Sequence, residues 1–188
     1  MPRIELYNDG SVSKTYTYDE LMKNPELLKF LKEFLAMRFN ALDYLNTWNP
    51  DPDDNMILFF TDRESPILRF VFQFKFINGI YYLYSVASPP APYRIPGFAR
   101  KSMINWLHTR RDRYVIIGMK IDDKDIVRIS TFYTGLGFTN PQLTNIVGPY
   151  HYEEPQIMLN RIPGTPISIP KNESLIKSIS YLARQYNK

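Results

Sequence analysis

The sequence contains no cysteine and only two histidines among its 188 residues. Without cysteine there is no disulfide framework, no thiol nucleophile and no thiolate ligand for a metal. Two histidines are too few for the usual ligand sets of a structural zinc site. We therefore expect no metal ion in this protein.

Long apolar runs are also missing. No stretch approaches the roughly 20 apolar residues of a membrane-spanning helix, and the opening MPRIELYNDG lacks the apolar core of a signal peptide. These absences predict a cytoplasmic (intracellular) protein with no membrane partner. A hydrophobic content of 44% over this length suffices for one sizeable core, so we expect a single domain over residues 1–188.

The charge balance is mildly basic, because 23 Lys and Arg residues face 19 Asp and Glu residues and leave a net charge of +4. Such a balance suits an anionic ligand or partner. The cations do not gather into the broad basic face with stacking aromatics that nucleic-acid binding requires. A nucleic-acid partner is therefore not expected.

Several patterns predict strands. ILRFVFQFKFI alternates, so Leu68, Phe70 and Phe72 are expected to share one face with the two phenylalanines that follow. Asn78-Gly79 predicts a hairpin turn into IYYLYSVA. The almost continuous apolar run RYVIIGMKI predicts a buried strand.

Helices are expected between and after these strands. Asn24 before Pro25 is typical of a helix start. Further helices are predicted over residues 97–111, where His108, Arg110 and Arg111 should form an exposed basic end, and over residues 122–138. The last helix, NESLIKSISYLARQY, should place Ile176, Ile179, Ala183 and Tyr186 on one face. The mixed order of elements predicts an α+β (mixed α/β) layered fold.

The stretch YSVASPPAPYRIPGFARKSMINWL joins a strand to a helix through a proline-rich turn. A helix N-terminus presents unpaired N–H groups and positive potential, which together favour phosphate. Gly97 would let a ligand approach the backbone, and Ala99 is too small to block it. This arrangement predicts a phosphate site, although an ordinary loop before a helix would have the same composition.

Two motifs in this half of the chain resemble those of the GNAT superfamily of acetyl-CoA-dependent N-acetyltransferases. YRIPGFAR resembles the signature Gln/Arg-x-x-Gly-x-Gly/Ala, with matches at Arg94, Gly97 and Ala99. FYTGLGF resembles the family's Tyr-x-x-x-Gly-Phe, in which Tyr133, Gly137 and Phe138 match the motif. The motifs occur in the family's order, and the resemblance extends over residues 10–162 of this chain.

The resemblance implies a mostly antiparallel central sheet flanked by helices, with a V-shaped splay between the family's fourth and fifth strands. Residues 164–188 lie beyond the family core as a C-terminal helical extension. Three roles remain open for this extension: packing over the sheet, closing the acceptor cleft, or forming a homodimer contact.

The resemblance also implies direct transfer of an acetyl group from acetyl-CoA to a primary amine of a small molecule, a protein lysine or a protein N-terminus. Tyr133 would be the general acid. The backbone of Val86 and Ala87 would hold the pantetheine arm. The pyrophosphate would be bound by N–H groups and cations at the turn, which come from Ile95, Gly97, Phe98, Ala99, Arg94, Arg100 and Lys101.

The general base is left open, because neither IYYLYSVA nor RYVIIGMKI contains an acidic residue. Asp62, Glu64, His151 and a water held by Ser85 or the strand tyrosines are alternatives, and an acceptor amine that is already partly neutral would need no side-chain base. Pro96 lacks the N–H group that the family often uses at this point. A catalytically silent member of the fold that binds acyl-CoA, or that serves protein interactions, is therefore the alternative function.

Overall fold

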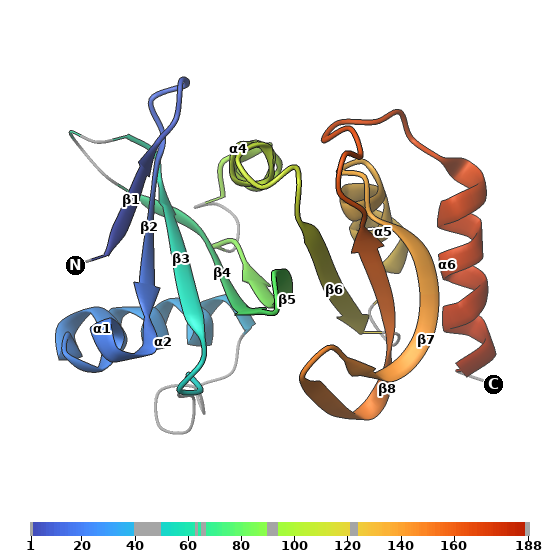
Figure 1. Cartoon of the computed structure of the whole chain (residues 1–188), viewed down its shortest axis with the longest axis horizontal. Coiled ribbons are helices and arrows are strands. Elements are labelled where there is room, and N and C mark those ends of the chain that lie inside the picture. Colours follow the sequence, from blue (N-terminus) through green and yellow to red (C-terminus); the bar gives the residue numbers. More distant parts are fainter. Residues whose placement is uncertain are drawn as a thin grey trace. The chain divides into compact units, whose positions relative to one another are not determined.

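The computed structural model describes residues 2–39, 50–62, 64, 67–89, 94–120 and 124–186 (Figure 1). Strands and helices are mixed along the chain, with runs of consecutive strands, as expected for the α+β class. In chain order they are β1 (Arg3–Leu6), β2 (Val12–Thr17), α1 (Tyr18–Met22), α2 (Pro25–Phe39), β3 (Asn55–Phe60), β4 (Leu68–Ile77), β5 (Ile80–Ala87), α4 (Phe98–His108), β6 (Tyr114–Lys120), α5 (Ile126–Thr134), β7 (Thr139–Val147), β8 (Tyr150–Arg161) and α6 (Glu173–Tyr186).

These elements form two compact units that interleave in sequence. The first comprises Met1–Lys75 and Ser85–Ser102, and the second comprises Phe76–Tyr84 and Met103–Lys188. The strand β5 and the helix α4 each begin in one unit and end in the other.

In the first unit, β1, β2, β3 and β4 pair in sequence order, and every pairing is antiparallel. One core of this unit gathers side chains from the helices α1 and α2, from β3 and β4, and from the end of β5. Its members are Leu21, Leu31, Phe34, Leu35, Met56, Leu58, Leu68, Val71 and Ala87. The apolar stripe of α2 is thus buried, as its helical spacing predicts.

The strand β4 carries an irregularity that the alternating pattern conceals. Phe59 pairs with Phe70, but the next residue of β3, Phe60, pairs with Leu68, so the register shifts at Arg69. A bulge of this kind reverses the faces beyond it. Leu68 therefore lies in the core with Val71, and the predicted single face for Leu68 and Phe70 is wrong. The phenylalanines at 70, 72 and 74 do form one aromatic row.

The helix starts follow local signals. Asn24 accepts a hydrogen bond from the Leu27 N–H at 3.2 Å, which confirms the predicted N-cap of α2. The short helix α1 was not predicted, although Thr17 and Glu20 form a reciprocal capping box at its start.

The second unit contains a sheet in the order β5-β6-β8-β7. β5 and β6 are parallel, whereas β8 is antiparallel to both of its neighbours. Within the described chain, registered pairing of β5 with β6 covers Ile80–Leu83 and Tyr114–Ile117 only, although β5 continues to Ala87 and β6 to Lys120. The pairing ends where the family resemblance implies that the two strands separate.

One face of this sheet is closely packed. Its side chains are at most 4% exposed and come from alternate positions of three strands: Leu83, Val115, Ile117, Met119, Ile157 and Leu159. Trp106 of α4 is fully buried and meets the Tyr81 ring edge-on at 5.1 Å. Arg110 lies over the Trp106 ring at 4.5 Å and is only 6% exposed, so its predicted place in an exposed basic end is wrong.

The end of α5 is tied to the segment that precedes α6. Arg161 is completely buried, and its Nε donates to the Leu136 carbonyl at 3.1 Å while Nη2 donates to the Thr165 carbonyl. The Ile169 N–H donates to the Gly135 carbonyl at 3.1 Å. The first part of the C-terminal extension therefore packs against the turn that ends α5.

At the start of α6, Asn172 accepts a hydrogen bond from the Leu175 N–H at 3.0 Å. Ile176, Ile179 and Ala183 of the predicted face are buried, whereas Tyr186 in the last turn is 38% exposed. Among the described residues, no helix has the length and apolar content to cross a membrane.

Candidate functional site

The turn before α4 holds Gly97 in a conformation that favours glycine. Its φ angle is +78°, in the left-handed region where a side chain costs about 1–2 kcal/mol. Among the described residues, no heavy atom would lie within 4 Å of a Cβ atom placed on Gly97. Conformation, and not crowding by the protein, therefore requires glycine here, and the backbone faces open space.

The amides around Gly97 divide into two groups. The Phe98 N–H donates to the Ile95 carbonyl at 3.1 Å, so this predicted cofactor donor is already engaged. Within the described residues, the N–H groups of Ile95, Gly97 and Ala99 donate to no protein acceptor. Three predicted donors are thus available to an anion at the start of an 11-residue helix.

The three predicted cations surround this turn with different engagements. Arg94 is exposed and donates through Nε to the Pro89 carbonyl at 3.3 Å. Arg100 is exposed. Lys101 Nζ lies 3.4 Å from Asp9 Oδ2, in the turn between β1 and β2. Asp9 was not predicted to take part, because it is distant in sequence and belongs to an ordinary turn signal.

The two predicted pantetheine residues end β5. Val86 is half-buried, whereas Ala87 is 1% exposed and belongs to the core of the first unit. Only their backbone was assigned a role, so burial of the Ala87 side chain is compatible with that assignment.

Tyr133 lies in the last turn of α5 and is 9% exposed. The rings of Phe132 and Phe138 meet it edge-on at 5.1 and 5.7 Å. Burial raises the pKa of Tyr133, so the phenol keeps its proton at neutral pH. Its hydroxyl makes no hydrogen bond to any described residue.

The structure does not single out a general base. Glu64 and His151 are exposed, and Asp62 is half-buried. The side chain of Ser85 lies outside what the structure describes. None of these residues is brought into hydrogen-bond contact with Tyr133 in the described part of the chain.

Asp51, Asp53 and Asp54 place carboxylate oxygens within 4.8 Å of one another. Lys75 forms ion pairs with two of these carboxylates, because its Nζ lies 3.3 Å from Asp51 and 3.0 Å from Asp53. Asp54 is buried and accepts from the Asp51 N–H at 2.6 Å. We interpret the cluster as a loop held together by a buried lysine.

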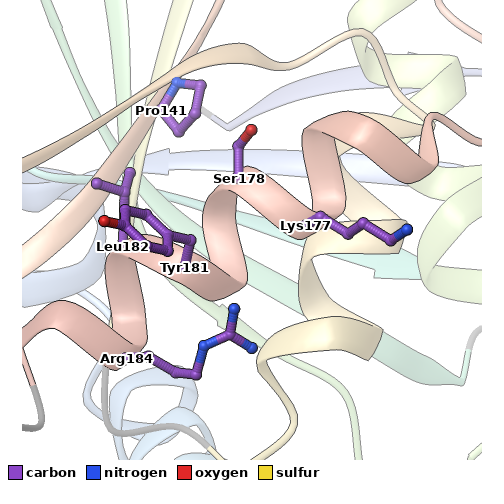
Figure 2. Close-up of a pocket in the computed structure, with 6 residues that line it drawn as sticks. All are labelled: Pro141, Lys177, Ser178, Tyr181, Leu182 and Arg184. Atoms are coloured by element: carbon purple, nitrogen blue, oxygen red, sulfur yellow. The ribbon is translucent and has the colours of Figure 1, made fainter.

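A separate shallow pocket of about 550 Å³ lies along α6. Figure 2 shows that Lys177, Ser178, Tyr181, Leu182 and Arg184 of α6 line it with Pro141 of β7. Neither Gly97 nor Tyr133 lines this pocket, and we assign it no catalytic role.

The fold is matched by solved structures. A protein assigned to the GNAT acetyltransferase family from Bacteroides thetaiotaomicron aligns with a TM-score of 0.54 and 16% identity, covering 94% of this chain and 98% of its own. Escherichia coli ElaA aligns with a TM-score of 0.52 and 16% identity, covering 79% and 98%. The chain has the GNAT fold. No family model matches the GNAT-fold chain by sequence, and no curated protein does so.

Proposed function

We propose that this GNAT-fold protein is an acetyl-CoA-dependent N-acetyltransferase that acetylates a primary amine. The observation that carries this function is the set of three amides around Gly97, at the start of α4, that donate to no acceptor among the described residues. They have the donor chemistry that a pyrophosphate needs, and the open space at Gly97 permits close approach. The absence of an N–H at Pro96 removes one donor and leaves these three.

The residues at the turn and on β5 would bind different parts of the cofactor. The N–H groups of Ile95, Gly97 and Ala99 would bind the pyrophosphate. Phe98 could join them by giving up its bond to Ile95, and Arg94, Arg100 and Lys101 would add charge. The Val86 and Ala87 backbone would bind the pantetheine arm as a neighbouring strand does. Bound acetyl-CoA would supply a thioester carbonyl that the amine nitrogen attacks.

Tyr133 would act as the general acid. As the new C–N bond forms and the C–S bond breaks, its hydroxyl would donate a proton toward the departing sulfur, and the amine would lose its own proton to water or to one of the open base candidates. A phenol that remains protonated at neutral pH suits this donor role.

The thermal shift of the protein with coenzyme A tests cofactor binding, and thiol release with amine acceptors tests acetyl transfer. Tyr133→Phe should keep the coenzyme A shift and lower kcat by about 100-fold or more, the usual contribution of a general acid. Tyr181→Phe, an exposed site on α6, is the matched control and should retain activity. No shift at millimolar coenzyme A would refute the transferase.

The second candidate is a silent acyl-CoA-binding member of the fold. The lack of an acidic residue on β5 and β6 favours it. It predicts a coenzyme A shift without thiol release from any acceptor, and no biological loss in Tyr133→Phe.

A further inference from the structure

The face of the second unit's sheet opposite its packed side is lined by tyrosines. The β5–β6 register puts Tyr82 beside Ile116, so that Tyr82 and Tyr84 share a face with Ile116 and Gly118. All four residues are partly exposed, in contrast to their buried neighbours Leu83, Val115 and Ile117.

The tip of the β7–β8 hairpin adds two more tyrosines to this face by folding over β6. A Cβ atom placed on Gly118 would lie 3.1 Å from Val147, which shows how closely the hairpin crosses the strand. At Gly148 a Cβ atom would lie 2.0 Å from the Tyr82 ring. Beyond the turn, the Tyr150 ring packs on Tyr84 at 4.3 Å.

Tyr152 extends the row, with its ring 6.3 Å from that of Tyr150. Four half-buried phenol rings, Tyr82, Tyr84, Tyr150 and Tyr152, thus form one surface, which we call the tyrosine face. Within the described residues, the Tyr82 and Tyr152 hydroxyls make no hydrogen bond and their rings carry no cation. Tyrosine side chains without such partners offer a ligand a flat apolar surface and a phenolic hydrogen-bond donor.

The position of this surface connects it with the proposed reaction. Tyr84 is two residues before Val86 on β5, which limits the separation of their Cα atoms to about 7 Å. Val86 is one of the residues whose backbone would hold the pantetheine arm. A ligand on the tyrosine face would therefore lie next to the strand that is proposed to present the thioester.

The chemistry of the surface favours one class of acceptor. β5 has no charged residue and β6 has only Lys120. The two carboxylates that follow Tyr152 on β8, Glu153 and Glu154, are exposed to water, where an ion pair with a polycation contributes little. Burial raises the pKa of Tyr152 to about 12, which indicates poor hydration. Poor hydration also disfavours an ammonium ion and so favours the neutral amine that must attack, without a side-chain base.

We propose that the tyrosine face binds the acceptor and selects a primary amine attached to a flat aromatic group over polyamines and lysine peptides, an assignment that rests on the proposed transferase function. The aromatic group stacks on the exposed rings, and the amine nitrogen projects toward the thioester.

Thiol release measured with phenethylamine, n-hexylamine, spermidine and a lysine peptide tests this selection. We expect phenethylamine to have a kcat/KM about tenfold above that of n-hexylamine, the effect of stacking on one ring. Equal or better turnover of spermidine or the peptide would overturn the selection while leaving the transferase intact.

Variants test the surface itself. Tyr152→Leu should raise KM for phenethylamine about tenfold and leave that for n-hexylamine within twofold, whereas Tyr152→Phe should retain the wild-type preference. Tyr181→Leu on α6 is the control. If Tyr152→Leu does not fold, as judged by its coenzyme A thermal shift, Tyr82→Leu takes its place. An unchanged phenethylamine KM in the folded variant would refute the tyrosine face.

Saturation-transfer NMR with phenethylamine and the coenzyme A-bound protein measures acceptor binding independently of acetyl transfer. Binding that weakens in Tyr152→Leu supports the surface even when no amine is acetylated. If phenethylamine does not bind at millimolar concentration, the surface is refuted whatever the outcome for coenzyme A.

Discussion

Gly148 lies so close to Tyr82 that an added Cβ atom would fall 2.0 Å from Cε1 of the ring. The φ angle of Gly148, +56°, disfavours a side chain independently of this contact. The hairpin tip and β5 are therefore fitted to each other at a position where only glycine leaves room.

Gly148→Ala should destabilise the protein by about 2 kcal/mol or more, because overpacking adds to the strain of the backbone. Urea unfolding measures the loss. Gly10→Ala is the matched control, since Gly10 has a φ of +89° but no atom within 4 Å of its Cβ position, and it should cost less. A double variant with Tyr82→Leu should recover part of the loss; strict additivity would show that the ring is not the obstacle.

Gly97→Ala should abolish most of the coenzyme A thermal shift, because the methyl group disturbs the backbone that would hold the pyrophosphate, and it should lower stability by about 1–2 kcal/mol. Gly164→Ala has a similar φ, +84°, and similarly open surroundings. This control should show comparable strain with an unchanged coenzyme A shift. Equal shifts in both variants would exclude the turn at Gly97 as the binding site.

Arg161→Leu should lower the free energy of unfolding by about 2–4 kcal/mol, since it removes two charged hydrogen bonds from a buried position. Hydrogen exchange at the Ile169 amide should quicken with it, because that amide bonds the same turn at Gly135. Arg128→Leu breaks an exposed ion pair with Asp125 and should cost no more than about 1 kcal/mol. Similar losses in the two variants would contradict the role of Arg161.

Alkaline pH should weaken the fold in part through Tyr152. Its pKa rises from the ordinary value near 10 to about 12 on folding, so the folded state holds the phenolic proton more tightly. This stabilisation is complete below pH 10 and is lost as the pH rises toward 12. Urea midpoints between pH 9 and 12 should fall less steeply in Tyr152→Phe than in the wild type. Tyr181→Phe removes an exposed tyrosine instead and should follow the wild-type slope.

Local signals were sufficient for most elements of the fold. Asn24 marked the start of α2, and the motif spacing placed Gly97 just before α4 and Tyr133 in α5, as expected. The bulge at Arg69 was not visible, because the alternation of apolar residues continues through it and the register shift arises only in the pairing with β3. The burial of Arg110 depends on Trp106 and Tyr81, which only the folded chain brings together.

The candidate site was predictable to the extent that it is made by consecutive residues. The amides at Gly97 follow from one turn, whereas the partnership of Lys101 with Asp9 requires the packing of a distant hairpin. The tyrosine face could not be predicted, because it depends on the register of β5, β6 and β8 and on the position of β7 at the hairpin tip. Alternation in IYYLYSVA places Tyr82 and Tyr84 together, but nothing local connects them with Tyr150.

The interleaving of the two units has a consequence for synthesis. The first unit needs Ser85–Ser102 for completion, but Phe76–Tyr84, which belong to the second unit, leave the ribosome earlier. A nascent chain therefore exposes the start of β5 before the first unit has all its residues. The two units cannot fold strictly one after the other during translation, and a gene fragment that ends at Lys75 encodes neither of them.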